Sequence, residues 1–319
     1  MSIKILKASL ASSLQDLGRR GFANLGIARS GAMDAYSLRM ANILLGNHQD
    51  EAGLEICLQG GVYEFLSDHY FVLSGADFAA KLDGKNIETS KVYHAKKGMI
   101  LNLDIAKKGF RGYLCVAGGF KVKPFLQSKS SDIKMGVGLF EGRFLKEGDI
   151  LPCEDIFVPF NLEKRSIENP ILQLDTQIKV RVLLNESAFS KKGIQSFLNT
   201  LYTVGSKSDR MGIYCESDER IEHKDSADII SQPVVFGSIQ VPASGLPIVL
   251  MAGRQSTGGY TMIASVIESD LYLLAQAKIG TKLRFERIDI QEALRLYKQR
   301  EESLSCLDKS LNLDFENLV

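Results

Sequence analysis

The sequence has few of the residues that form disulfides or bind metals: its 319 residues include five cysteines and four histidines. The cysteines are far apart, odd in number and mostly within apolar segments, which is typical of buried thiols in a reducing cytoplasm. No two of them have the spacing of a zinc knuckle, and the histidines are scattered along the chain. The sequence therefore predicts neither a disulfide framework nor a metal site.

An excess of charge of either sign is missing as well, since 39 basic and 38 acidic residues give a formal net charge of +1. The absence of a large basic block argues against a dedicated nucleic-acid binder. No apolar run is long enough to span a membrane. The first residues, Met1 to Ile5, lack the apolar core of a signal peptide. We therefore expect a cytoplasmic protein that binds neither nucleic acids nor membranes.

Signatures of nucleotide binding and covalent carrier chemistry are also missing. The segment Gly205-Ser206-Lys207-Ser208 has the flavour of a phosphate loop but lacks the upstream glycine. Neither a dinucleotide-binding fingerprint nor a nucleophile elbow occurs. The lysine in Ile133-Lys134-Met135 lacks the preceding methionine of a biotin carrier. We therefore expect no covalent biotin, and we find no visible machinery for ATP in this chain.

What the sequence does have is enough apolar residues, 45%, for sizeable cores, in a length that favours two domains. Short apolar runs recur between residues 54 and 151, separated by glycine-bearing breaks, which indicates a β-barrel or sandwich. A segment with two prolines and several charges, Glu154 to Asp175, predicts the interdomain linker. We accordingly place the domains at residues 1–165 and 166–319.

Helices are expected at a few places. Asp34 is a good N-cap for a helix over 35–45, and Gly46 supplies its C-terminal stop. Further helices are expected over 189–201 and after Asp289. Residues 127–142, rich in serine, lysine and glycine, predict a long surface loop.

One glycine-bearing polar segment, Gly253–Tyr260, follows the strand-like run 248–252 and precedes the run 262–267, which we interpret as a helix start. Free N–H groups at a helix start carry partial positive charge and attract anions. This pattern predicts a site for a carboxylate or a developing oxyanion; the alternative is an ordinary turn with a Ser or Thr cap. The segment's candidate residues are Arg254, Gln255, Ser256, Thr257, Gly258, Gly259 and Tyr260.

Other polar positions are candidates on weaker patterns. Arg19 follows a polar turn, and its guanidinium offers a planar fork to carboxylates. Asp77, within Ser74-Gly75-Ala76-Asp77-Phe78, either orients a substrate or closes an Asx turn. Asp34 is either a helix cap alone or a functional acid as well. For Arg210, next to Asp209, a turn is the default interpretation.

Four segments taken together resemble one family over nearly the whole chain. They are Ser13–Arg19, Ser30–Asp34 with Leu38–Asn42, Ser208–Gly212 and Gln255–Tyr260. The chain is similar to the KipA family, also called allophanate hydrolase subunit two or the biotin-dependent carboxyltransferase family. Stand-alone bacterial members of that family serve in 5-oxoprolinase complexes.

The resemblance implies a mainly β fold with two cyclophilin-like β-barrel domains and a few flanking helices. It also implies a KipI-type (PxpB-type) partner, a PxpA-type partner and an active cleft shared with the KipI-type subunit. The implied activity is that of the C subunit (PxpC-type) of an ATP-dependent 5-oxoprolinase, with ATP used by the complex. The alternatives are the carboxyltransferase component of a biotin-dependent urea carboxylase or allophanate pathway complex, and a non-catalytic regulator.

The implied reactions act on amide-like groups whose oxygen gains negative charge, which donors such as Arg and Gln stabilise. On this basis Asp34, Asp77, Gln255 and Thr257 are the expected catalytic residues. Arg19, Arg210 and Arg254 are expected to bind substrate, together with Ser256, Gly258, Gly259 and Tyr260. The chain departs from the family pattern at Gly253, where aspartate is typical, and at Arg20 and Thr261, where proline is typical.

Overall fold

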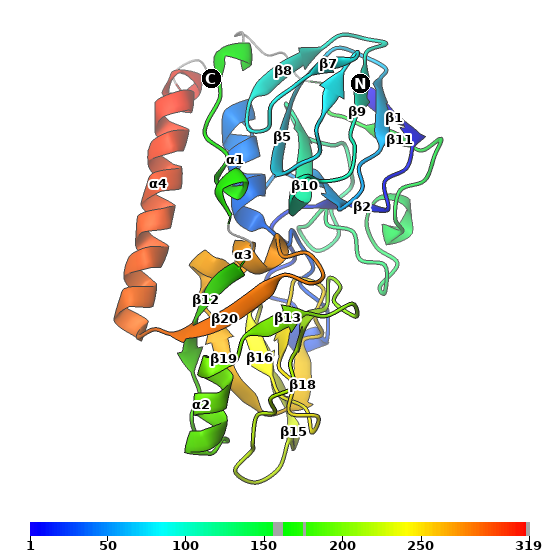
Figure 1. Cartoon of the computed structure of the whole chain (residues 1–319). Helices are drawn as coiled ribbons and strands as arrows, with labels where there is room; N and C mark the ends of the chain where they lie inside the picture. The colour runs from blue at the N-terminus through cyan, green and yellow to red at the C-terminus, as the bar shows by residue number, and fades with distance from the viewer. Residues whose placement is uncertain (156–161, 175–176, 317–319) are drawn as a thin grey trace. The chain divides into compact units, whose positions relative to one another are not determined.

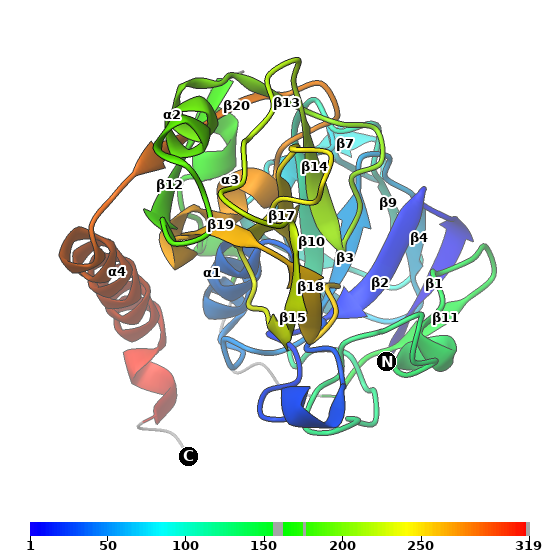
Figure 2. The same cartoon turned by 90° about the horizontal axis from the view of Figure 1, so that it is seen from below.

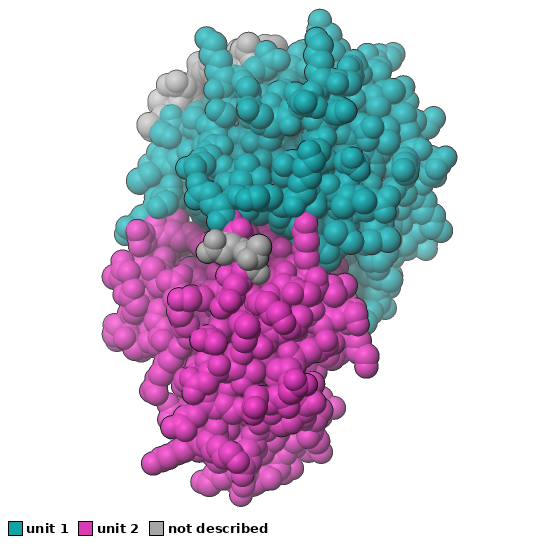
Figure 3. All heavy atoms as spheres, viewed as in Figure 1, with its two compact units in different colours: residues 1–19, 30–173, 302–319 teal, residues 20–29, 174–301 magenta. Residues whose placement is uncertain are grey.

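The computed structural model describes residues 1–155, 162–174 and 177–316 (Figure 1). It is mainly β with few helices, which confirms the predicted fold class. The chain divides into two compact units, teal and magenta in Figure 3. Unit 1 comprises 1–19, 30–173 and 302–319, and unit 2 comprises 20–29 and 174–301. A single division into 1–165 and 166–319 does not describe this arrangement, because each unit takes up segments distant in sequence.

Unit 1 contains two antiparallel sheets with a hydrophobic core that includes Ile3, Leu54, Phe71 and Leu114. The six-stranded sheet has the order β11 (Ile150–Pro152), β1 (Ser2–Lys7), β4 (Val62–Phe65), β9 (Ile100–Asn102), β6 (Lys81–Leu82) and β7 (Lys85–Asn86). The five-stranded sheet has the order β2 (Ala11–Gln15), β3 (Gly53–Cys57), β10 (Lys108–Val116), β5 (His69–Asp77) and β8 (Val92–Ala95). Alternation of buried and partly exposed residues along β1 matches a strand with one face on this core.

Helix α1 (Ala35–Leu45) packs on β5 and β10. Its predicted boundaries are confirmed. The Asp34 side chain accepts a hydrogen bond from the N–H of Ser37, and Gly46 ends the helix in the left-handed region at φ 71°. The short helices η2 (Leu139–Gly142), η3 (Leu162–Lys164) and η4 (Pro170–Gln173) complete unit 1.

The segment predicted as the linker, 154–175, belongs in part to the packed body of unit 1, and residues 156–161 and 175 of it lie outside the described residues. Leu162 and Ile171 are fully buried. The Asn169 side chain donates to the carbonyl of Gly75 at 2.8 Å. The described part up to Gln173 is therefore anchored to unit 1.

Unit 2 is built on a closed seven-stranded barrel. The barrel order is β12 (Gln177–Leu184), β19 (Met262–Val266), β16 (Ser238–Gln240), β17 (Ile248–Leu250), β14 (Gly212–Glu216), β13 (Tyr202–Val204) and β20 (Lys282–Arg287). Strands β12 and β20 are parallel and close the barrel. The stacked rings of Phe197 and Phe285, with centroids 4.6 Å apart, contribute to the packing between α2 (Lys191–Asn199) and the barrel.

A separate two-stranded ribbon pairs β15 (Asp228–Pro233) with β18 (Thr257–Tyr260), as Figure 2 shows from a second direction. Unit 2 also has η1 (Ala23–Leu25), η5 (Glu268–Asp270) and α3 (Leu271–Ala275). The last helix, α4 (Ile290–Glu316), begins in unit 2, and its residues from Glu302 onward belong to unit 1. No described helix combines the length and apolar character that a membrane span requires.

The helix predicted over 262–267 is wrong, because Met262–Val266 form β19 of the barrel wall. Strand β19 pairs with β12 on one side and β16 on the other. A short apolar run buried in a barrel has no period that separates strand from helix. The prediction of a surface loop over 127–142 needs correction too, since Ser128, Ser130 and Ser131 are buried.

Candidate functional site

The polar segment Gly253–Tyr260 follows β17 and runs directly into β18. The N–H of Gly253 donates to the carbonyl of Arg210 at 2.7 Å, and the N–H of Arg254 donates to Met251 at 3.2 Å. These amides therefore serve ordinary turn bonding. The hypothesis that a helix start supplies free N–H groups here is wrong, because no helix follows the segment.

The side chain of Arg254 is 9% exposed and is held by neutral groups. Its Nε donates weakly to the carbonyl of Val234 at 3.5 Å, its Nη1 donates to Met251 at 3.3 Å, and its guanidinium lies over the Phe236 ring. Burial lowers the pKa of Arg254 to about 10, and the positive charge of Arg29 adds to this effect. Arg29 belongs to the same unit.

The remaining residues of the segment differ in exposure. Gln255, Thr257 and Tyr260 are exposed, Ser256 and Gly259 are half-buried, and Gly258 is buried. Gly258 packs so closely on Gln240 that a Cβ would lie 2.4 Å from its Nε2. The exposed side chains on β18 are available to an external ligand or partner.

Arg210 is half-buried in a turn closed by Asp209, whose Oδ1 accepts from the N–H groups of Met211 at 2.7 Å and Gly212 at 3.2 Å. The structure thus brings the motifs 208–212 and 253–260 side by side through the Gly253–Arg210 hydrogen bond. A Cβ at Gly253 would lie 3.1 Å from the Arg210 carbonyl oxygen. This approach is tighter than most Cβ contacts, so a larger residue at position 253 would require a small shift of the Arg210 backbone.

In unit 1 the motifs 13–19 and 30–34 meet around the buried side chain of Gln15. Its Nε2 donates to the carbonyl of Ser131 at 3.1 Å, and its Oε1 accepts from the N–H of Gly31 at 3.2 Å. The N–H of Ala32 donates to the carbonyl of Asp16 at 2.8 Å. Two loops that are distant in sequence are therefore joined by buried hydrogen bonds.

Arg19 lies at the end of the first of these loops and is 2% exposed. One guanidinium nitrogen donates to the carbonyl of Ser130, and the Phe125 ring centroid lies 5.6 Å from Cζ. Burial lowers the pKa of Arg19, although the charges of Asp16 and Asp132 act in the opposite direction.

The carboxylate of Asp34 is fully buried and serves the start of α1. Its oxygens accept from the N–H and the Oγ–H of Ser37, at 2.9 and 2.6 Å. Its own N–H donates to the Tyr113 hydroxyl, which in turn donates to Glu55 at 2.7 Å. Burial, together with the charges of Glu55 and Asp34, raises the pKa of Tyr113. These contacts are those of a helix N-cap, which is one of the two roles that the sequence left open for Asp34.

Asp77 ends β5, and its Oδ1 accepts from the N–H of Ala79 at 2.8 Å. This is the Asx turn that the sequence left open as an alternative. Ala79 itself adopts a positive φ of 47°, which the turn stabilises. The carboxylate is half-buried and shapes the loop between β5 and β6.

Comparisons with known proteins agree with the motifs. A model of the carboxyltransferase domain, subdomains A and B, matches residues 25–287. The chain belongs to this carboxyltransferase family. It is 38% identical to the C subunit of 5-oxoprolinase from Haemophilus influenzae, over 94% of this chain and 95% of that protein. It is 37% identical to the C subunit of 5-oxoprolinase from Escherichia coli, over 92% and 93%.

The solved structure of the Kluyveromyces lactis urea carboxylase also resembles this chain. The TM-score is 0.87 at 25% identity, and the match covers 96% of this chain and 29% of that one. The chain therefore corresponds to one part of a larger enzyme there, whereas it matches the bacterial subunits along nearly their whole length.

Sequence reasoning missed several residues of these clusters. Arg29, Gln15 and the buried serines of 128–131 were not among the expected site residues. Arg29 stands directly before the Ser30–Asp34 motif. Its position next to that motif could have identified it as a candidate from the sequence. The serines gave no signal, because their burial depends on contacts more than 100 residues away in sequence.

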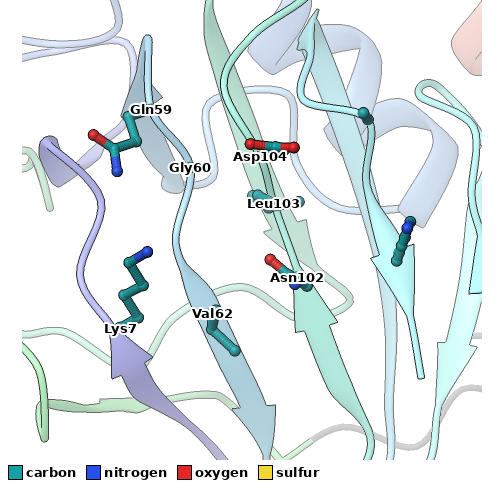
Figure 4. A pocket seen from close by; sticks show the side chains of 9 residues that line it. Lys7, Gln59, Gly60, Val62, Asn102, Leu103 and Asp104 are labelled. Carbon is teal, nitrogen blue, oxygen red and sulfur yellow. The ribbon is translucent and has the colours of Figure 1, made fainter. Parts of the chain in front are cut away.

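No group of three or more metal-ligating side chains occurs in the described ranges 1–155, 162–174 and 177–316. A cavity of about 280 Å³ opens on the six-stranded sheet of unit 1, where Lys7, Gln59, Asn102 and Asp104 lie around it (Figure 4). None of the predicted site residues lines this cavity. Ala79, whose N–H donates to the Asp77 carboxylate, is however among the residues that line it.

Proposed function

We propose that this chain is the C subunit of an ATP-dependent 5-oxoprolinase complex. The observation that carries the proposal is the similarity to two such subunits at 38% and 37% identity, along nearly the full length of both partners in each comparison. The match to yeast urea amidolyase is weaker, at 26% identity over 18% of that protein.

The proposed reaction opens the lactam ring of 5-oxoproline to glutamate. Water adds to the lactam carbonyl, the carbon–nitrogen bond breaks, and the ring nitrogen leaves as the amine after taking up a proton. ATP hydrolysis drives the reaction, and negative charge builds up on the carbonyl oxygen. Fixed donors stabilise such charge, by roughly 3 kcal/mol for one well-placed group.

Two buried guanidiniums support this chemistry, Arg254 in unit 2 and Arg19 in unit 1. We propose that each of them binds an anionic group within its own unit, and that Arg210 and the residues 255–260 add contacts to the group at Arg254. The acid–base roles expected for Asp34 and Asp77 remain predictions. The contacts of the two carboxylates account for a helix cap at Asp34 and a turn at Asp77, and they do not call for a catalytic role.

We propose that the chain acts in the cytoplasm with a KipI-type (PxpB-type) subunit and a PxpA-type subunit. ATP is then used by the complex, and this chain carries no covalent biotin. The exposed side chains on the β15–β18 ribbon, such as Ile230 at 94% and Tyr260 at 41%, support a role in contacts outside the chain.

A second candidate is a carboxyltransferase that acts on urea or a related amide. The similarity to the urea carboxylase structure supports it. A third, a non-catalytic regulator that binds a KipI-type partner, is supported only by the glycine at position 253 where the family has an acid.

The deciding experiment measures glutamate release from 5-oxoproline and ATP by the three co-purified subunits, with each subunit omitted in turn. We expect release only from the full set. Carboxybiotin-dependent transfer to urea without glutamate release would instead establish the second candidate. Unaltered turnover of a Gln255→Ala variant in every assay would point to the regulator.

A further inference from the structure

We infer that Arg19 binds the carboxylate of the substrate. We also infer that Asp16 positions the Arg19 side chain through the segment 124–131. The inference rests on the proposed function, because it takes the substrate to be a carboxylate-bearing lactam and not uncharged urea. It starts from the Arg19 guanidinium, whose Nε and Nη1 are buried and have no hydrogen-bond partner in the described part of the chain. A buried cation with unused donors is costly unless it is paired, so it gains free energy from an anion that reaches those donors.

Two contacts from one segment fix the guanidinium. The carbonyl of Ser130 accepts from Nη2, and the ring of Phe125 lies at cation–π distance, 5.6 Å. Contacts to an aromatic face leave the N–H groups in the guanidinium plane for other partners. A carboxylate is the anion that matches them, because its two oxygens lie in one plane.

Two acids influence Arg19 electrostatically, yet each is engaged by other donors. The Asp132 Oδ1 accepts from the N–H groups of Lys134 at 3.0 Å and Met135 at 3.1 Å. No hydrogen bond or ion pair joins Asp16 or Asp132 to Arg19 among the residues with described positions. Arg19 therefore keeps its capacity for an anion from outside the chain.

The carboxylate of Asp16 anchors residues 128–130, and the carbonyl of Ser130 in turn accepts a hydrogen bond from Arg19. The Asp16 carboxylate accepts from the N–H of Gly18 at 2.7 Å and, within the segment, from Ser128 Oγ at 2.8 Å, Lys129 N at 2.6 Å and Ser130 Oγ at 2.5 Å. The Lys129 ammonium pairs with Glu51 at 2.7 Å as a second anchor. Asp16 is thus a positioning residue, since its bonds fix Ser130 and not the ligand.

The inference separates two substrate classes. 5-Oxoproline carries a carboxylate on the carbon next to the ring nitrogen, whereas urea and 2-pyrrolidinone carry none. 2-Pyrrolidinone is the same lactam ring without the acid, so comparing these two lactams isolates the carboxylate contact.

The first test uses Arg19→Met and Arg19→Lys in the co-purified complex, with the exposed Arg284→Met as the matched control. We expect KM for 5-oxoproline to rise about 30-fold in Arg19→Met and about 10-fold in Arg19→Lys, with kcat within about threefold and Arg284→Met unchanged. The melting temperature of ligand-free Arg19→Met should not fall, because an unpaired buried cation is removed. A loss of kcat at constant KM, or no change in a folded Arg19→Met complex, would overturn the assignment.

The second test concerns position and uses Asp16→Asn, with Asp132→Asn as the control for charge. Both substitutions remove one negative charge near Arg19, but only Asp16 bonds Ser128 to Ser130. We expect faster amide hydrogen exchange over 128–131 and a KM increase of about 10-fold in Asp16→Asn alone. Equal effects in the two variants would show that charge, and not position, is responsible.

A readout independent of turnover separates this inference from the proposed function. The isolated chain is titrated with ¹³C-labelled 5-oxoproline and with 2-pyrrolidinone by NMR. Binding of 5-oxoproline that Arg19→Met abolishes, with no binding of 2-pyrrolidinone, supports the carboxylate receptor even if the complex fails to release glutamate. Equal binding of both lactams contradicts the receptor even if the complex is an active 5-oxoprolinase.

Discussion

The buried carboxylate of Asp34 shows how a cap and a catalytic acid can be told apart. Asparagine caps helices as well as aspartate does, whereas alanine leaves the N–H of Ser37 without a partner. We expect Asp34→Ala to lower the free energy of unfolding by about 1–2 kcal/mol and Asp34→Asn by less than about 1 kcal/mol, measured by urea denaturation. We also expect the Asn variant to keep its turnover, because both oxygens serve Ser37. A folded but inactive Asn variant would assign Asp34 to the chemistry.

His69 makes the stability of unit 1 depend on pH. Burial, aided by the N-terminal ammonium and His94 and opposed by Asp68, lowers the pKa of His69 to about 4. The unfolded chain binds the proton near pH 6.5, so the stability from neutral His69 is complete above pH 6.5 and is lost as the pH falls toward 4. The contribution is on the order of 2–3 kcal/mol.

Comparison of the wild type with His69→Asn checks this contribution. Urea denaturation at pH 7 and at pH 4.5 should show a smaller difference in unfolding free energy for the variant, because asparagine does not titrate. Carboxylates that titrate in the same range affect both proteins equally and cancel in the comparison. An identical pH dependence in the two proteins would mean that His69 is not the responsible group.

At the residue scale the sequence predicted chemical types better than contacts. Arg19 and Arg254 were singled out as cations, and the structure adds that both are buried and that Arg19 has two guanidinium nitrogens without a hydrogen-bond partner in the described residues. Their surroundings, Phe125 and Ser130 for one and Phe236 for the other, come from distant segments. A local pattern cannot specify such neighbours, because they depend on how the loops pack.

At the scale of elements, the two loops of unit 1 approach through a glycine. Gly31 has φ 95°, and a Cβ there would lie 2.9 Å from the backbone nitrogen of Gly18. Gly21 has a similar φ of 89°, and a Cβ added there would meet nothing within 4 Å, which makes it a matched control. Positive φ alone costs an alanine about 1–2 kcal/mol.

We therefore expect Gly31→Ala to destabilise by about 3 kcal/mol or more, and Gly21→Ala by about 1 kcal/mol, in urea denaturation. The excess comes from the clash with backbone, which cannot move aside as a flexible side chain can. Equal losses in the two variants would mean that the loops separate without cost.

The capped helix α1 was predictable, whereas the short apolar run 262–267 was not. The helix after Asp34 and its stop at Gly46 followed from local chemistry that the structure retains. The run 262–267 was misread because five of its six residues, Met262–Val266, form a strand of the barrel wall, and β12 on one side of this strand is remote in sequence. The free N–H groups that such a helix would supply are therefore not available from it, and the anion site over 253–260 stays a prediction.

At the scale of the whole molecule, the chain passes between its units after Arg19, Arg29, Gln173 and Glu301. Composition indicated only the third of these positions, which lies within the segment 154–175. The other three carry no linker-like signal, because ordinary loops and a continuous helix make the passage. Domain boundaries of this kind depend on packing and are invisible to composition.

The last of these positions, after Glu301, lies within α4, and the part of α4 beyond it leads to a testable prediction about unit 1. Within unit 1, the end of α4 covers α1: Leu304 is 2% exposed in a cluster with Met40 and Ile43, and the Asn312 side chain donates to the Ile43 carbonyl at 3.1 Å. Deletion of residues 302–319 would expose this surface. Burial of one leucine alone is worth about 1.5–3 kcal/mol.

We expect the chain truncated after Glu301 to lose amide protection in α1 in hydrogen-exchange mass spectrometry, while peptides of the unit 2 barrel keep theirs. The barrel thus serves as the control within the same molecule, and Cys306→Ser, an exposed position on the same helix, serves as the control variant. The expectation follows from the contacts of Leu304 and Asn312, which lie wholly within unit 1. Equal loss of protection in both units would show that they unfold as one cooperative body, and an unchanged α1 would show that the end of α4 contributes nothing to its stability.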